Sequence, residues 1–244
     1  MSLPKIDQPI HNINVPSMKK KFPFRPFLVK EEKLLLMAKE SQTPSDILGA
    51  IKQVVNNCCL EPKLVVEKLP IFDLEYLFLK LRSLSVDNVV KITYKDFEDE
   101  KEYNFEIDLN KVEVKFPEKN SENIKISNKS GIVMRYPTAS LYDDKEFTSL
   151  EKDYMFELIV RCIDKIYYED DIYEAKDYKK QELVEFLENL NVATFEKILE
   201  FLTNVRYFPD SRHVSIDLTS IPIEDANSFK DSRFTHPVPS PFQF

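Results

Sequence analysis

The chain has 244 residues, 43% of them hydrophobic and 31% charged, which is typical of a folded protein with one large or two small domains. Its only two glycines are Gly49 and Gly131. This excludes a P-loop, a Rossmann fingerprint and a kinase-type glycine-rich loop, because each needs several glycines to bring backbone close to phosphate. No apolar run approaches the roughly 20 residues of a membrane span, and the first residues lack the apolar segment of a secretory signal. We therefore expect a protein that stays in the cytoplasm where it is made.

The net charge of −8 is unevenly distributed along the chain. Residues 1–27 hold five basic groups and one acidic group, so this segment carries +4 and the remainder carries −12. An acidic body repels nucleic acid, so no nucleic-acid partner is expected. A short basic segment on an acidic body suits self-assembly or binding to an acidic protein partner.

Residues 1–27 also contain five prolines, each of which removes an amide donor and fixes φ. We interpret this segment as an extended arm that lies either along a neighbouring subunit or along the protein's own body. A Pro-rich, aromatic tail at 207–244 forms a second extended segment, for which a mobile tail is the alternative. The residues predicted to bind partners are Lys19, Lys20, Lys21, Phe22, Phe24, Arg25, Phe27, Phe242 and Phe244. For the three lysines, the alternative is a solvated charge cluster.

Three helices are predicted after the arm. Val29 to Glu40 is rich in Glu, Lys and Leu, which favour helices. Thr43-Pro44 resembles an N-cap followed by proline at the first helical position, and the apolar spacing behind it predicts an amphipathic helix to Cys58. Asp73 is predicted to cap a third helix that ends near Ser85.

The hydrophobic period then changes from 3.6 to 2. Apolar and charged residues alternate from Val90 to Tyr94 and from Tyr103 to Leu109, with an acidic turn between them. The alternation continues through Val112, Val114 and Phe116, and short strands are possible around Ile124 and Ile132. This pattern predicts a small antiparallel meander with one apolar face.

Helices are expected again after Pro137. Thr148 with Glu151 is a possible capping box. The longest apolar stripe in the chain is interpreted as helical: Phe156, Ile159, Val160, Ile163, Ile166 and Tyr167. Two further helices are predicted around Leu187 and Leu199. The fold class is therefore α+β, with N-terminal helices, a small antiparallel meander, C-terminal helices and an extended Pro-rich segment at each end. The expected regions are 1–27, 28–140, 141–206 and 207–244.

Residue types that carry chemistry are few and scattered. The cysteines and histidines show no metal-ligand spacing: Cys58, Cys59, Cys162, His11, His213 and His236. The densest acidic pairs, Asp143-Asp144 and Asp170-Asp171, fall in segments expected to connect helices, where solvated charge is the better interpretation. Arg82 and Arg135 are interpreted as structural ion-pair partners. We expect no catalytic, cofactor-binding or metal-binding residue, no small-molecule ligand and no membrane contact.

Three segments carry a resemblance to a known family when taken together and in order: RPFLVKEEKLLL from Arg25, AIKQVVNNC from Ala50 and FDLEYLFLKLRSLSV from Phe72. Met134-Arg135-Tyr136-Pro137 adds a fourth. The chain resembles the baseplate hub family of T-even-type, contractile-tailed bacteriophages from about residue 22 to 140. Some members of that family carry paired cysteines around the meander or near the C-terminus. The corresponding turn in this chain, Asp96 to Glu100, has no cysteine, so the resemblance implies no zinc site there.

This resemblance implies a non-enzymatic structural part of the virion's tail baseplate, with other baseplate or tail proteins as partners and copies of the chain itself as a further option. The alternative is an assembly chaperone for the hub that is absent from the mature virion. An unrelated cytosolic adaptor or an enzyme is a weaker interpretation. The family contributes no catalytic residues to this chain.

Overall fold

A computed structural model of the chain describes residues 6–41, 43–95, 102–114, 116, 121–149 and 154–204. These residues form two units. Unit 1 comprises residues 6–65 and 73–114, and unit 2 comprises 66–72 and 116–204. Within the described residues there are seven α-helices, two two-stranded antiparallel sheets and one four-stranded antiparallel sheet, so the expected α+β class is confirmed. The expected region 28–140 contributes to both units.

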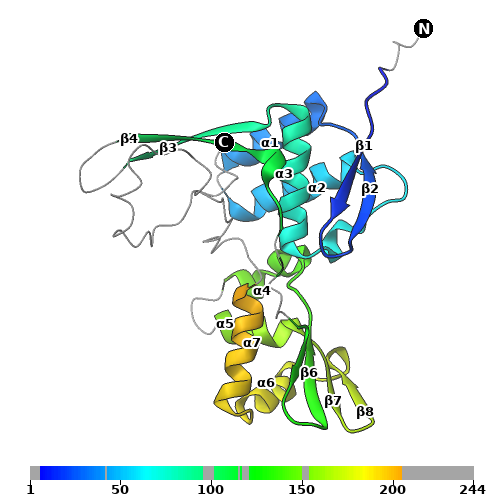
Figure 1. Ribbon diagram of the computed structural model, residues 1–244, viewed down its shortest axis with the longest axis vertical. Helices are drawn as coiled ribbons and strands as arrows, with labels where there is room; N and C mark the ends of the chain where they lie inside the picture. Colours follow the sequence, from blue (N-terminus) through cyan, green and yellow to red (C-terminus); the bar gives the residue numbers. More distant parts are fainter. Residues whose placement is uncertain are drawn as a thin grey trace. The chain divides into compact units, whose positions relative to one another are not determined.

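Unit 1 combines helices with two hairpins (Figure 1). Its elements, in chain order, are β1 (His11–Val15), β2 (Lys20–Phe24), α1 (Val29–Ser41), α2 (Pro44–Cys58), most of α3 (Ile71–Ser85), β3 (Val89–Lys95), β4 (Glu102–Asp108) and the 3-10 helix η2 (Leu109–Lys111). The predicted helices are confirmed. Thr43 is the N-cap of α2 with Pro44 at the first helical position, and Ile51, Val54, Val55 and Cys58 are buried on one face, as the apolar spacing predicts.

The N-terminal segment packs on its own body, which is one of the two arrangements considered for it. β1 and β2 form an antiparallel hairpin in which Ile13 pairs with Phe22. β2 also joins the chain after α2, where Leu60 N donates to Pro23 O at 2.8 Å and Arg25 N donates to Cys58 O at 3.0 Å. Proline has no backbone N–H to donate. Pro23 is tolerated in this strand because its contact with Leu60 uses the proline carbonyl as the acceptor.

Two expectations for unit 1 were wrong. α3 begins at Ile71, so Asp73 lies inside the helix and does not cap it. The backbone N–H of Ile71 donates to Pro137 O at 3.1 Å, which satisfies a first-turn donor without a side-chain cap. The alternating run after residue 109 forms no strand: η2 interrupts it, and 112–114 lie outside any described strand. The predicted acidic turn after β3 lies outside the described residues.

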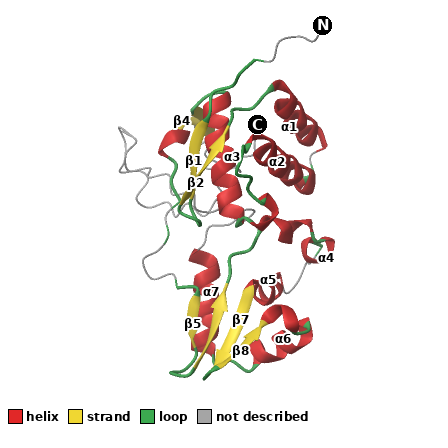
Figure 2. Cartoon of the chain, turned by 90° about the vertical axis from the view of Figure 1, so that its right-hand side faces the viewer, coloured by secondary structure: helices red, strands yellow, loops and turns green. Residues whose placement is uncertain are grey.

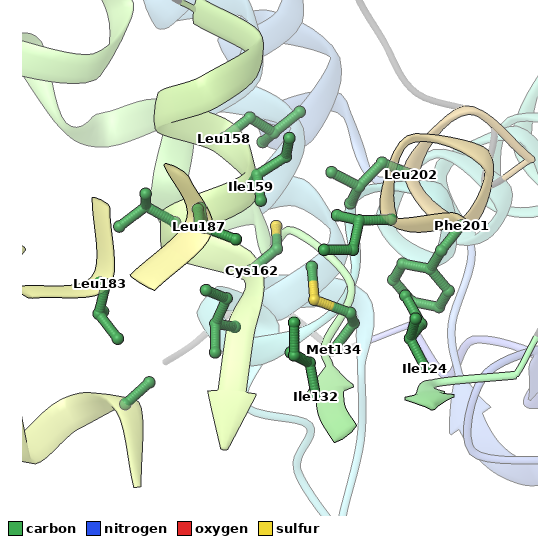
Figure 3. Packing of buried hydrophobic residues seen from close by; sticks show 14 of the residues in the cluster. Ile124, Ile132, Met134, Leu158, Ile159, Cys162, Leu183, Leu187, Phe201 and Leu202 are labelled. Atoms are coloured by element: carbon green, nitrogen blue, oxygen red, sulfur yellow. The ribbon is translucent and has the colours of Figure 1, made fainter. Parts of the chain in front are cut away.

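Unit 2 is a four-stranded antiparallel sheet with helices on one face (Figure 2). Its strands run β5-β6-β7-β8 in sheet order: β5 (Asn123–Lys125), β6 (Ser130–Met134), β7 (Ile163–Tyr168) and β8 (Asp171–Glu174). Its helices are η1 (Val66–Lys68), η3 (Ala139–Asp143), α4 (Lys145–Thr148), α5 (Tyr154–Cys162), η4 (Ala175–Asp177), α6 (Lys180–Glu188) and α7 (Val192–Asn204). Ile132 and Met134 of β6 meet Ile159, Leu187 and Phe201 of the helices in a buried cluster (Figure 3).

The interpretation of the apolar stripe around Ile163 as one helix was wrong. α5 ends at Cys162, and the next residues form β7, which pairs with both β6 and β8. Ile163, Ile166 and Tyr167 are β-branched or aromatic, so they suit a strand once neighbouring strands complete its hydrogen bonds. Thr148 ends α4, whose N-cap is Asp144, and Glu151 of the proposed capping box lies outside the described residues.

Candidate partner-binding surfaces

The turn between β1 and β2 presents a basic surface. Pro16 to Lys19 make the turn, and the Lys19 backbone adopts a left-handed φ of 50°. Lys19, Lys20 and Lys21 are all exposed, and Met18 beside them is 48% exposed. We call these four residues the hairpin tip. The hairpin itself was missed from the sequence, although two short apolar alternations on either side of a turn containing Pro and Ser were a usable signal.

The hairpin tip is held in place by a buried carboxylate of α3. Ser17 N donates to Asp73 Oδ1 at 3.1 Å, and Ser17 Oγ donates to Asp73 Oδ2. Asp73 is fully buried, and this burial raises the pKa of its carboxyl above the ordinary value, although the hydrogen bonds from Ser17 act in the opposite direction. Lys19 therefore lies in a turn that is anchored to the helical body of unit 1, and Lys20 and Lys21 follow directly at the start of β2.

The aromatic residues predicted to bind partners lie largely inside unit 1. Phe22 is 7% exposed and Phe24 is fully buried, because β1 and β2 direct them towards the helices. Phe27 is half-buried and stacks on Phe78 of α3, with ring centroids 5.9 Å apart. Phe22 and Phe24 thus stabilise the fold of unit 1, and partner contact stays a prediction for the exposed lysines. Phe242 and Phe244 lie outside the described residues.

Arg25 is an internal ion-pair partner. Its guanidinium contacts both carboxylate oxygens of the fully buried Glu31, at 3.0 and 3.1 Å, and donates to Asn57 O at 3.2 Å. Leu28 N donates to the same carboxylate at 2.9 Å. Burial raises the pKa of Glu31, but the hydrogen bonds from Arg25 and Leu28 outweigh it and hold the pKa below its ordinary value. This ion pair ties β2 to α1 and α2.

The outward side of α1 carries exposed apolar residues. Val29 is 82% exposed, Leu36 is 54% exposed and Met37 is 58% exposed. The opposite side of the helix packs on unit 1 through Glu31 and Ala38, both buried. The composition of this segment predicted a helix but did not predict an apolar outer surface.

Unit 2 has its own exposed residues at the β7–β8 hairpin. Tyr168 is 55% exposed and Ile172 is 62% exposed. The turn between the strands contains Glu169, whose φ is 52° and whose carboxylate pairs with Lys129 Nζ at 2.6 Å. The Asp170-Asp171 pair therefore lies at a hairpin turn and strand start, and not between helices as expected, although its interpretation as surface charge is compatible with this position.

Other chemistry-bearing residues have structural roles. Asp144 accepts from the backbone N–H groups of Glu146 and Phe147 and pairs with Arg161 Nη1 at 2.6 Å. Arg135 lies 4.0 Å from Asp164 and donates to the Arg161 carbonyl. The three cysteines are free and buried, and burial raises the pKa of Cys58 to about 11.

Within the described ranges, no group of three or more His, Cys, Asp or Glu side chains is placed to hold a metal ion. None of the described helices combines the length and the apolar character that crossing a membrane requires.

Comparison with known proteins identifies the family. A family model described as T4 bacteriophage base plate protein matches residues 8–225, which extends beyond the resembling segments at both ends. No curated protein and no solved structure matches the chain. The match includes the hairpin tip, α1 and both units, and it covers most of the 244 residues. The chain therefore belongs to the T4 bacteriophage base plate protein family.

Proposed function

We propose that the chain is a structural subunit of the central hub of a phage tail baseplate, without catalytic activity, and that it acts through protein–protein contacts in the virion. Family membership gives a structural or assembly role in the base plate. The narrower assignment to the hub is supported by the segments from Arg25, Ala50 and Phe72, which resemble the hub family and contribute to α1, α2 and α3.

The observation that carries this proposal is the anchored hairpin tip. Three exposed lysines lie in and directly after a turn that Asp73 fixes to α3. The rest of the chain carries a net charge of −12, beside the +4 of residues 1–27. Such a fixed basic surface favours an acidic protein surface as its partner, because complementary charge both speeds encounter and selects the partner. Assembly would take place in the host cytoplasm before the tail is complete.

The test is quantitative mass spectrometry of purified, intact particles of the phage that encodes this chain, and of its baseplate assembly intermediates. We expect the chain in intact particles at a fixed ratio to the other tail proteins. Presence in intermediates but absence from particles would replace the structural role with that of an assembly chaperone. Absence from both would overturn the proposal.

A further inference from the structure

α1 has two faces of unequal character. Its inner face, at the spacing i, i+3, i+4 and i+7, contains Glu31, Leu34, Leu35 and Ala38, of which Glu31 and Ala38 are buried. Its outer face, at the spacing i, i+4, i+7, i+8 and i+11, contains Val29, Lys33, Leu36, Met37 and Glu40. We call this second set the outer face of α1. Figure 2 shows α1 at the periphery of unit 1, with α2 on one side of it.

The outer face of α1 is more apolar than folding of unit 1 requires. All three of its apolar side chains are more than half exposed, while the inner face buries the charged Glu31. A single exposed apolar residue needs no explanation. Here Leu36 and Met37 are neighbours on one face of a peripheral helix and Val29 lies about two turns before them, a grouping that is typical of an interface.

The charges on this face are self-complementary. Lys33 precedes Leu36 by three residues, and Glu40 follows Met37 by three residues. When two copies of α1 cross in antiparallel fashion about a two-fold axis at Leu36–Met37, Lys33 of each copy lies opposite Glu40 of the other. The same alignment puts Glu32 opposite Ser41, so it brings no like charges directly together at these positions. A parallel pair would instead place Lys33 beside Lys33 and Glu40 beside Glu40, so like charges would face each other.

We propose that the outer face of α1 binds the same face of α1 in a second copy of this chain, antiparallel and about a two-fold axis. Leu36 and Met37 form the apolar centre of this contact, and two Lys33–Glu40 ion pairs flank it. Such an interface is isologous, because both copies contribute the same surface: Lys33 of each copy meets Glu40 of the other. The inference concerns the chain itself and does not depend on its position in the base plate.

The contact is small. A helix of 13 residues is about 20 Å long, and one helix pair buries less than the standard interface of about 800 Å² per partner. The expected dimer is therefore a weak one, with a dissociation constant in the micromolar range, which additional contacts would strengthen inside an assembly.

Sedimentation velocity of the full-length chain from micromolar to millimolar concentration tests the pairing. Four variants are compared with the wild type: Lys33→Glu, Glu40→Lys, the double variant with both changes, and the control Lys68→Glu at an exposed position in unit 2. All three substituted positions are at the surface, so each variant should keep the fold, which thermal unfolding verifies.

We expect a concentration-dependent dimer for the wild type and the control. Each single reversal should raise the dissociation constant at least tenfold, because it places like charges opposite each other twice in the symmetric contact. The double variant should have a dissociation constant within about threefold of the wild-type value, since both ion pairs reform with opposite polarity. A wild type that stays monomeric throughout, single reversals without effect, or a double variant without recovery would each overturn the pairing.

Discussion

The ring of Tyr167 lies across Gly131 on the side of the four-stranded sheet opposite the core, and its hydroxyl donates to Asn123 Oδ1 at 3.0 Å. A Cβ at Gly131 would meet the Tyr167 hydroxyl, its Cζ at 2.6 Å and Ile124 O at 2.7 Å. Gly131 has no left-handed φ, so glycine is required there for space and not for backbone conformation.

Gly131→Ala should therefore lower the free energy of unfolding by about 1–3 kcal/mol, because the backbone oxygen of Ile124 cannot rotate away as a side chain can. The matched control is Gly49→Ala. A Cβ at Gly49 meets nothing within 4 Å, and the position is helical and exposed. Gly49→Ala should therefore raise the free energy of unfolding by about 0.5–1 kcal/mol. Urea denaturation monitored by circular dichroism measures both. Equal effects of the two substitutions would contradict the close approach of Tyr167.

Arg25→Met should lower the free energy of unfolding by about 3–5 kcal/mol, because it leaves Glu31 buried without its ionic partner. The double variant Arg25→Met/Glu31→Leu should recover part of this loss, since it removes the unpaired charge, while Leu28 N loses its acceptor. A double-mutant cycle measured by chemical denaturation gives the coupling. If the loss of stability in the double variant equalled the sum of the losses in Arg25→Met and Glu31→Leu, the two side chains would not be energetically coupled.

Asp73 should make the protein relatively more stable at low pH. Its folded pKa lies above the ordinary value because of burial, so the folded state binds a proton more tightly than the unfolded state. Its contribution to stability is therefore greatest below the unfolded pKa of about 4 and declines as the pH rises through the folded pKa.

The free energy of unfolding of the wild type minus that of Asp73→Asn should consequently increase as the pH falls from 7 to about 4. Using the difference cancels the titration of groups that both proteins share. Glu31 has the opposite sign: its pKa is lowered, so its contribution is present at neutral pH and is lost as acid protonates it. A difference that shrinks towards low pH would contradict the assignment for Asp73.

Lys21→Glu should reduce incorporation into baseplate intermediates by about tenfold while changing unfolding by less than about 0.5 kcal/mol, because Lys21 is exposed at the hairpin tip. Lys111→Glu, an exposed lysine of η2 with the same change in charge, serves as the control and should incorporate normally. Competition between tagged variant and wild-type chains during infection measures incorporation. Equal loss in both variants would point to net charge rather than to the hairpin tip.

Lys19→Gly separates the structural and electrostatic roles of the hairpin tip. Glycine adopts the left-handed φ of 50° without strain, so the substitution should stabilise the protein by up to about 1 kcal/mol while it removes one positive charge. Thermal unfolding checks the first effect, and the competition experiment should still show weaker incorporation. Deletion of residues 1–21 is a poorer test, because it would remove β1 and leave Phe22 without its paired strand.

Local signals in the sequence predicted much of the helical framework. Thr43-Pro44 marks the start of α2 because capping and proline act within one turn, and its apolar spacing identifies the buried face around Ile51. β3 and β4 follow from their period of two.

The candidate surfaces were less predictable, because their exposure depends on what packs nearby. Lys19 to Lys21 were singled out by charge, but Phe22, Phe24 and Arg25 look equally suited to a partner until the helices that cover them are placed. Likewise, the apolar residues of α1 fit a core helix until the structure shows that α2 packs on it and that Leu36 and Met37 stay exposed.

The sequence by itself therefore determined the helices whose start, end and periodicity are encoded within a few residues, together with the alternating strands β3 and β4. Tertiary structure alone decided that Ile163 to Tyr168 form a strand, since the apolar pattern suits both states and only β6 and β8 supply the hydrogen-bond partners that select one. It also decided that Asp73 anchors a turn 56 residues away and does not cap its own helix. Such choices depend on contacts between residues distant in the chain, and local propensity does not contain them.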